Sequence, residues 1–290
     1  MSFGKRPISK EKFRIMVNPQ GIDIEKWVGE RAPLVQPGEL ESWILEEDER
    51  MLVLNKPGWL VCHPSKNGPW SSLVGALREA RNLDQVHLVS RLDRETSGLV
   101  VLAKDAGMGS ILQKAMAQRM VEKRYHAVLE GTLPVIVGEK LTVDVPLVND
   151  RKSLVHVKCK AQKGQQGSRA VSHFAPLEIG REYSLVEVQI ETGRKHQIRA
   201  HAEWIGNRVV GDKIYGPDAL WFLKFTETGW TDEMAAALVH PRQALHCSEM
   251  VFRLDGQEPL KFRAPFQEDY LSLLRRVGLK TTDPFATTDA

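Results

Sequence analysis

The sequence predicts an α+β fold, built on a mixed, mostly antiparallel sheet with flanking helices. Strand-like segments follow one another with few helices between them, which is typical of antiparallel sheets, and the longest run covers 121–130, 141–146, 154–161, 169–177 and 182–190. With 290 residues, of which 42% are hydrophobic and 27% charged, the chain is long enough to bury a substantial core. Because 41–280 contains no repeat and no compositional break, we expect one domain there, with an N-terminal extension over 1–40 and a C-terminal tail over 281–290.

The segment ahead of the first strongly charged loop predicts three strands and a helix. Residues 50–55 and 59–63 are expected as two short strands joined by a Lys-Pro-Gly turn. Ser71 is a candidate N-cap for a helix that ends near Asn82. The apolar residues 86–89 predict the end of a further strand.

In a charged loop over 90–97, Asp93 lies between Arg91 and Arg94. A second apolar strand starts directly after Gly98, which supplies the backbone freedom that a sharp turn needs. Two strands that flank the loop would keep the carboxylate in a fixed place, as a reactive group requires. A salt-bridged surface turn is the alternative interpretation of the same charges.

The remaining part of the domain adds helices and a last strand. Residues 106–120 predict a helix, and another helix is expected to begin at about Lys195, after the long run of strands. Arg194 precedes this helix, so the guanidinium and the positive end of the helix together predict an anion site. A strand over 243–254 and a helix over 269–277 complete the domain.

The composition argues against several classes of protein. No apolar run is long enough to span a membrane, and the N-terminus has no apolar signal core, so we expect a cytoplasmic protein. Cys62, Cys159 and Cys247 are far apart and odd in number, which argues against a disulfide framework and a zinc site. His196 and His201 lie five positions apart, which is not the spacing of two metal ligands on one helix face. The glycines match no dinucleotide or P-loop fingerprint, so neither a metal nor a cofactor is expected.

The net charge of +3 is small, but it is unevenly distributed. Residues 119–200 hold 14 Lys and Arg residues against 9 Asp and Glu residues, and the flanking parts of the chain are close to neutral or acidic. A basic middle third is compatible with a phosphate-rich partner.

The charged loop carries the most specific motif of the chain. Its letters Arg91-Leu-Asp-Arg-Glu-Thr-Ser-Gly98 resemble the nucleophile loop of the RluA-type pseudouridine synthases. The resemblance implies a pseudouridine synthase fold with a central RNA-binding cleft, pseudouridine formation in RNA as the activity, and Asp93 as the catalytic residue. One letter departs, because the family usually has His at the position of Ser90.

Two further motifs of that family occur in the expected order. The stretch 192–199, Thr-Gly-Arg-Lys-His-Gln-Ile-Arg, matches the third motif, whose last arginine pairs with the catalytic Asp, and this implies that role for Arg199. The stretch 122–131 matches the second motif, whose Tyr stacks on the target uracil and is implicated in proton transfer. That residue here is Tyr125.

Two shorter segments extend the resemblance to roughly residues 45–265. The segment 55–64 looks like the early Asn-Lys-Pro…Val-His-Pro segment, interrupted here by Cys62. The segment 242–246 looks like the late Arg-Gln-Ala-Leu-His segment, whose Leu contacts the base and corresponds to Leu245.

The implied reaction breaks the C1′–N1 bond of uridine, rotates the base and joins C1′ to C5, so it needs no redox cofactor. A stacked nucleotide is inaccessible, and the target must be flipped out. We expect Arg91 to fill the vacated space or to hold the flipped phosphate, and Tyr125 and Leu245 to enclose the detached base. Attack by Asp93 on C1′ and attack on C6 both remain open. A salt bridge between Asp93 and Arg199 would favour the ionised carboxylate.

The other candidate residues are expected to bind substrate. Lys123, Arg194 and Lys195 would contact phosphates without discriminating between sequences. Arg94 and His196 complete the substrate-binding set, since both belong to the family motifs.

Two rival functions come from other classes. A non-catalytic RNA-binding protein that keeps the fold is one, favoured only by the departures at Ser90 and Cys62. A glycosidase-like enzyme that releases uracil is the other. Such enzymes use two cooperating carboxylates, and Asp93 is the only acid whose sequence context indicates a catalytic role.

The partner is expected to be rRNA or tRNA, and nothing in the sequence demands more than a monomer. Residues 1–40 are too short for the S4 RNA-binding domain that many family members carry. RNA selection would then depend on the catalytic domain, with 215–240 as a candidate insertion that could equally be a packing lid.

Overall fold

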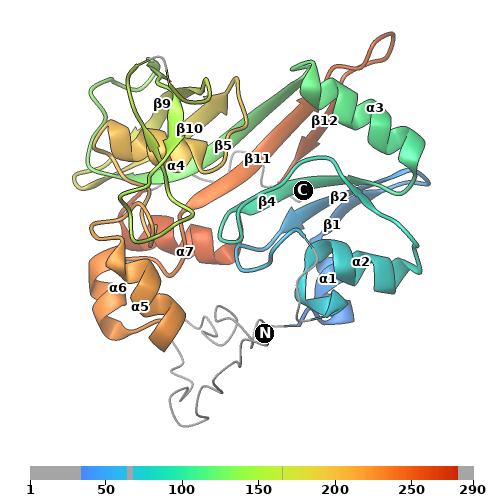
Figure 1. Ribbon diagram of the computed structural model, residues 1–290, viewed down its shortest axis with the longest axis horizontal. Helices are drawn as coiled ribbons and strands as arrows, with labels where there is room; N and C mark the ends of the chain where they lie inside the picture. The colour runs from blue at the N-terminus through green and yellow to red at the C-terminus, as the bar shows by residue number, and fades with distance from the viewer. Residues whose placement is uncertain (1–33, 64–67, 165, 280–290) are drawn as a thin grey trace.

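A computed structural model describes residues 34–63, 68–164 and 166–279 (Figure 1). Its main sheet has the strand order β1-β2-β4-β11-β5-β10-β9-β6. These strands are β1 Ile44–Glu47, β2 Met51–Lys56, β4 Ser97–Ala103, β5 Val121–Glu130, β6 Leu141–Asp144, β9 Val171–Ile179, β10 Tyr183–Ile190 and β11 Leu245–Phe252. β4 and β11 run parallel, and every other pair of named strands in the described residues is antiparallel. The predicted mixed, mostly antiparallel sheet is therefore confirmed.

Short strands extend this sheet at its middle. β3, His87–Leu88, pairs with β4, and β12, Leu260–Arg263, pairs with β11. β7, Leu147–Asn149, and β8, Cys159–Ala161, form a separate two-stranded sheet.

Helices lie at both ends of the sheet. α1 and α2 gather beside β1 and β2, α4 lies against β8 and β9, and α5 and α6 form a pair at the edge of the molecule (Figure 1). The helices are α1 Pro37–Trp43, α2 Leu73–Arg81, α3 Ala106–Ala117, α4 Gln197–Trp204, α5 Leu220–Thr228, α6 Asp232–Leu238 and α7 Glu268–Arg276, with a 3-10 turn at Pro69–Ser71. No helix in the described ranges is both long and apolar enough to cross a membrane.

The two halves of the sheet meet where β4 and β11 lie side by side. Ser97 pairs with His246 and Gly98 with Cys247, and every residue of both strands is buried. Gly98 has a φ of +106°, and a Cβ atom there would lie only 2.2 Å from the carbonyl oxygen of Cys247. Glycine is therefore required at the point where the charged loop enters the centre of the sheet.

The apolar core is one contiguous cluster that spans both halves of the sheet. α5 and α6 have a small cluster of their own, formed by Phe225, Trp230, Met234 and Leu238. The segment 215–240, the candidate insertion, thus contains a helical pair with a small cluster of its own, while Phe222 and Leu223 of α5 pack against the main core.

Several predicted elements differ from the structure. The strand expected at 59–63 is wrong, because the Lys56 ammonium binds the carbonyls of Pro57 and Leu60 and closes this segment into a turn. The strand expected at 154–161 is shortened to β8, since the residues before Cys159 form a loop. The N-cap of α2 is Ser72 rather than Ser71, and its hydroxyl accepts from the Gly75 amide.

The packed chain also begins earlier than the expected boundary at 41. α1 starts at Pro37, and both Val35 and Leu40 are buried. Most of the predicted extension, 1–33, and the predicted tail, 281–290, lie outside the described residues.

Candidate active site

All of the site residues predicted from the sequence line one cleft of about 990 Å³. The hairpin between β3 and β4 supplies one wall, the paired strands β5 and β11 supply the floor, and the start of α4 supplies the opposite wall. The predicted residues that meet there are Arg91, Asp93, Arg94, Lys123, Tyr125, Arg194, His196, Arg199 and Leu245.

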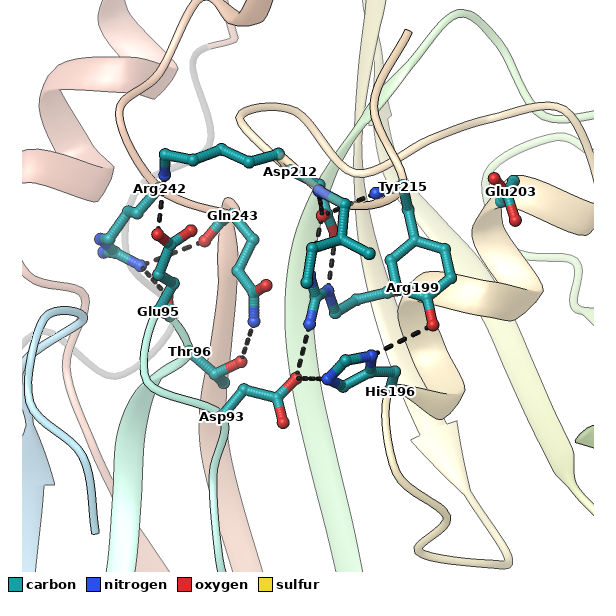
Figure 2. Close-up of polar contacts among 12 residues, drawn as sticks. Asp93, Glu95, Thr96, His196, Arg199, Glu203, Asp212, Tyr215, Arg242 and Gln243 are labelled. Carbon is teal, nitrogen blue, oxygen red and sulfur yellow. Dashed lines mark hydrogen bonds and ion pairs between the residues drawn. The ribbon is translucent and has the colours of Figure 1, made fainter. Parts of the chain in front are cut away.

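The carboxylate of Asp93 faces α4 at the centre of this cleft (Figure 2). Its Oδ2 accepts a hydrogen bond from Nη1 of Arg199 at 2.9 Å, and Nε2 of His196 lies 3.9 Å from the same oxygen. Burial would raise the pKa of Asp93, but the Arg199 guanidinium and, after it, His196 together outweigh the effect of burial, so that the pKa lies below its usual value. Asp93 is therefore ionised at neutral pH while 32% of its side chain stays exposed.

A second acid completes the environment of Arg199. Nε and Nη2 of the guanidinium donate to the two oxygens of Asp212, which is fully buried (Figure 2). The same carboxylate accepts the amide hydrogens of Ile214 at 2.9 Å and of Tyr215 at 3.0 Å. A bidentate pair of this kind fixes the plane of the guanidinium and so directs Nη1 at Asp93.

Tyr125 and Leu245 lie on the floor of the cleft. Tyr125 on β5 pairs with Cys247 on β11, two positions from Leu245, so the two side chains are diagonal neighbours on one sheet face. Both are at least 90% buried. Burial raises the pKa of Tyr125 well above its usual value, which leaves a neutral phenol. The pair therefore offers an apolar and aromatic surface beside the Asp93 carboxylate.

The basic residues surround this floor at different depths. Arg91, Arg194 and Lys195 are exposed at the walls, Lys123 and Arg94 are half-buried, and burial lowers the pKa of both of the last two. The backbone N–H of Arg194 donates to the Gln197 side chain at 3.1 Å. The Arg194 amide is therefore not available to bind an anion at the predicted anion site. The exposed side chain of Arg194 is the group that would bind it.

Three comparisons bear on the family of this chain. Residues 50–204 match the family model described as RNA pseudouridylate synthase. The chain is 33% identical over 247 residues to the uncharacterized RNA pseudouridine synthase YjbO of Bacillus subtilis, across 83% of this chain and 78% of that relative. The chain belongs to the RluA family of RNA pseudouridine synthases. It is an isomerase that acts on RNA.

Further relatives of the synthase agree with this assignment. It is 34% identical over 245 residues to the ribosomal large subunit pseudouridine synthase D of Xanthomonas campestris pv. campestris, across 82% of this chain and 70% of that one. The solved structure of human RNA pseudouridylate synthase domain containing 4 matches with a TM-score of 0.65 and 26% identity, across 85% of this chain and 97% of that one.

The loop that carries Asp93 is bound to its surroundings on two sides. On one side, Nζ of the buried Lys56 donates to the carbonyl of Arg94 at 3.0 Å. On the other, Lys213 forms a 2.7 Å ion pair with Glu95, and the Gln243 amide donates to the hydroxyl of Thr96 (Figure 2). The backbone next to Asp93 is therefore fixed on both flanks.

The two departures from the family pattern lie beside this loop. The Ser90 hydroxyl is buried, and it has no hydrogen-bond partner among the residues described. The Cys62 thiol lies 3.6 Å from the Leu92 carbonyl and donates to it. Cys62 therefore supports the loop directly, whereas Ser90 does not.

Sequence reasoning missed Asp212, Lys213 and Tyr215, although all three shape the site. They fall in the segment Gly-Asp-Lys-Ile-Tyr-Gly over 211–216. Two charges between glycines, directly after a buried apolar pair, are the feature that could have marked this turn as a buried ion-pair partner.

No group of three or more potential ligands in the described chain could hold a metal ion.

Proposed function

We propose that this synthase converts a specific uridine of structured rRNA or tRNA into pseudouridine, with Asp93 as the nucleophile and with the target base flipped into the cleft. The observation that carries the proposal is an ionised carboxylate fixed at one oxygen only. Oδ2 of Asp93 is bound by Arg199, whereas Oδ1 has no hydrogen-bond partner among the residues described, and Asp93 lines the cleft together with Tyr125.

The remaining cleft residues support each step of the reaction. Oδ1 attacks C1′ or C6, the C1′–N1 bond breaks, and the detached uracil turns until C5 joins C1′. The bond to Oδ1 then breaks, with the carboxylate displaced from C1′ or eliminated from C6, so that Asp93 is regenerated. The C5 hydrogen is lost as a proton and N1 gains one, so the product is an isomer of the substrate. Tyr125 and Leu245 would enclose the base while it turns, and Arg91 would occupy the space that the flipped nucleotide leaves. No step requires a cofactor.

The names of several relatives favour rRNA over tRNA. Three of the relatives from different bacteria are called ribosomal large subunit pseudouridine synthase D, and the synthase is 32 to 34% identical to them. An enzyme of that kind would act in the cytoplasm, where ribosomes are assembled. We propose the same compartment here and a monomeric enzyme, with α5 and α6 as the element that selects the RNA, because Phe222 of α5 lines the cleft.

Tritium release tests this function directly. Transcripts of rRNA and tRNA labelled with [5-³H]uridine would lose tritium to water when pseudouridine forms. We expect release with the wild-type protein and none with Asp93→Asn, whereas Asp84→Asn, at an exposed acid outside the cleft, should leave the rate unchanged. Release by Asp93→Asn at the wild-type rate would refute the nucleophile.

The rival functions give different products in the same reaction. A glycosidase-like enzyme would liberate free uracil, which chromatography separates from pseudouridine in digested RNA. A non-catalytic binding protein would retain RNA on a filter without tritium release from any transcript.

A further inference from the structure

A chain of polar contacts leads from the backbone of β8 to the Asp93 carboxylate. Figure 2 shows its last two steps, from Tyr215 to His196 and from His196 to Asp93. The backbone amide of Cys159 donates to the Tyr215 hydroxyl oxygen at 2.9 Å. That oxygen lies 3.1 Å from Nδ1 of His196. An amide N–H can only donate, and Nδ1 is the one other hydrogen-bond partner of this hydroxyl among the described residues, so the phenol hydrogen is satisfied only by donating to Nδ1.

We propose that Tyr215 is a positioning residue that fixes His196 in the tautomer with hydrogen on Nε2, so that a neutral imidazole presents an N–H to Asp93. The tautomer follows from these contacts together with the absence of charge on the imidazole. Its importance for catalysis depends on the proposed role of Asp93 as nucleophile.

The surroundings of His196 keep the imidazole uncharged. Burial is the largest cause and the positive charge of Arg199 the next, and together they lower the pKa of His196 to about 4. Asp93, Asp212 and Lys195 are the other charged groups that affect it. Only 8% of the His196 side chain is exposed. A neutral imidazole carries one N–H, so an acceptor role for Nδ1 places the hydrogen on Nε2.

The backbone and the Tyr215 ring fix where that N–H points. His196 is the N-cap of α4 and has a φ of +56°, and its ring meets the ring of Tyr215 edge to face at 5.6 Å. The guanidinium carbon of Arg199 lies 4.9 Å from the centre of the same Tyr215 ring. Tyr215 thus orders both groups that approach Asp93.

The tautomer determines the sign of the interaction with Asp93. With hydrogen on Nε2, the imidazole dipole attracts the carboxylate, whereas the other tautomer would direct a lone pair at Oδ2. The Nε2–Oδ2 distance of 3.9 Å is longer than a hydrogen bond, but catalytic contacts often shorten when substrate closes the site. Arg199 and His196 would then both bind Oδ2 and leave Oδ1 for the substrate.

Nitrogen-15 NMR of protein labelled in histidine tests the tautomer without any substrate. We expect His196, assigned by its loss in His196→Gln, to show a protonated Nε2 and an unprotonated Nδ1 at neutral pH. Tyr215→Phe keeps the buried ring but removes the hydroxyl, and should mix the two tautomers. Tyr183→Phe, at a tyrosine outside the cleft, is the matched control and should not. A protonated Nδ1 in the wild type, or an unchanged spectrum in a folded Tyr215→Phe, would overturn the proposal.

A pH profile tests the effect on Asp93. The groups that act on its carboxylate are Arg199, His196 and Asp212. Removal of the Nε2–H donor should raise the pKa of Asp93, so the acid limb of kcat/KM should move to higher pH in His196→Leu, with about a tenfold loss below that limb.

His196→Gln carries the same backbone strain as His196→Leu but restores an N–H donor, so its acid limb should stay near that of the wild type. If His196 had only a structural role, both substitutions would lower kcat/KM at every pH and leave the acid limb of the pH profile in place. If Asp93→Asn were fully active, the proposed function would fail while the tautomer result stood.

Discussion

Arg199 joins Asp93 to Asp212, with Nη1 at 2.9 Å from Oδ2 of Asp93 and with Nε and Nη2 on the two oxygens of Asp212. The guanidinium is only 5% exposed, so it lies in a medium where charge pairs interact strongly. Two carboxylates around one guanidinium leave a net negative charge, and it resides on the acid that faces the cleft. This arrangement keeps Asp93 ionised and leaves it free to react.

Replacement of Arg199 by lysine should damage both stability and activity. A single ammonium cannot bind Asp212 at both oxygens and reach Asp93 as well, so one buried carboxylate loses its partner. We expect a loss of about 3 kcal/mol in the free energy of unfolding and a loss on the order of a hundredfold in kcat. Arg208→Lys, in a more exposed pair with Glu130, should cost about 1 kcal/mol or less and keep kcat. Equal effects of the two changes would contradict the assignment.

Lys56 predicts a separate effect on the nucleophile loop. Its buried ammonium donates to the carbonyls of Pro57, Leu60 and Arg94, and burial lowers its pKa to about 8. Lys56→Met should leave these carbonyls without a donor, lower the free energy of unfolding by about 2 to 4 kcal/mol, and reduce kcat more than it changes KM. Lys114→Met, at an exposed lysine of α3, is the control. Urea titration would measure the free energy of unfolding, and single-turnover kinetics would measure the rate of the chemical step. A Lys56→Met variant with full kcat would show that the loop keeps its geometry without Lys56.

The buried histidines predict that the folded synthase loses stability in mild acid. Burial lowers the pKa of His126 and His196 to about 4 and that of His240 and His246 to about 3. The unfolded chain binds these protons near the usual pKa of 6.5, so it holds more protons than the folded chain in the window between 6.5 and 4.

The free energy of unfolding should therefore fall as the pH decreases through that window, by on the order of 1 kcal/mol per buried histidine at pH 5. His246→Asn should flatten this dependence, whereas His156→Asn, at an exposed histidine, should not. Urea titrations between pH 7 and pH 5 would measure the slope. An equal free energy of unfolding at pH 7 and at pH 5 would refute the prediction.

Arg194 predicts a change in the salt dependence of RNA binding. Its side chain is exposed at the wall of the cleft, where it would contact phosphate. Arg194→Ala should weaken binding for every RNA sequence and lower the slope of log K against log salt by about one. Arg181→Ala, at an exposed arginine outside the cleft, should leave the slope unchanged. Filter binding over a range of salt concentrations would measure the slope for both variants, and an equal slope for Arg194→Ala and Arg181→Ala would contradict the phosphate contact.

Local sequence patterns predicted the elements whose apolar residues recur with the period of a strand or a helix. β5 has the predicted bounds of 121–130, and α7 differs from its prediction by one residue at each end. α1 was missed because its first residues were assigned to the N-terminal extension, although proline favours the first turn of a helix. α5 and α6 were missed because both are short and their apolar residues are divided between a small cluster of their own and the main core, which leaves no long periodic stripe.

The site could be predicted where a motif carries it and not where the fold brings distant residues together. Asp93, Tyr125 and Arg199 come from three ordered motifs, and the structure places all three in one cleft. Asp212 lies 13 positions from Arg199 in the chain, and no local pattern shows that a turn returns it to the guanidinium. The same holds for Lys56, whose ammonium donates to the carbonyl of Arg94 although the two residues lie 38 positions apart in the sequence.

Pseudouridine mapping of total RNA from cells decides whether this protein modifies a uridine through the Asp93 carboxylate. Cells that lack this gene would be compared with cells that carry the wild-type gene or the Asp93→Asn variant at equal protein level. We expect a uridine that is modified with the wild type and unmodified with both the deletion and Asp93→Asn. A site that Asp93→Asn restores in full would contradict it, because the chemistry would then not depend on the carboxylate at the centre of the cleft.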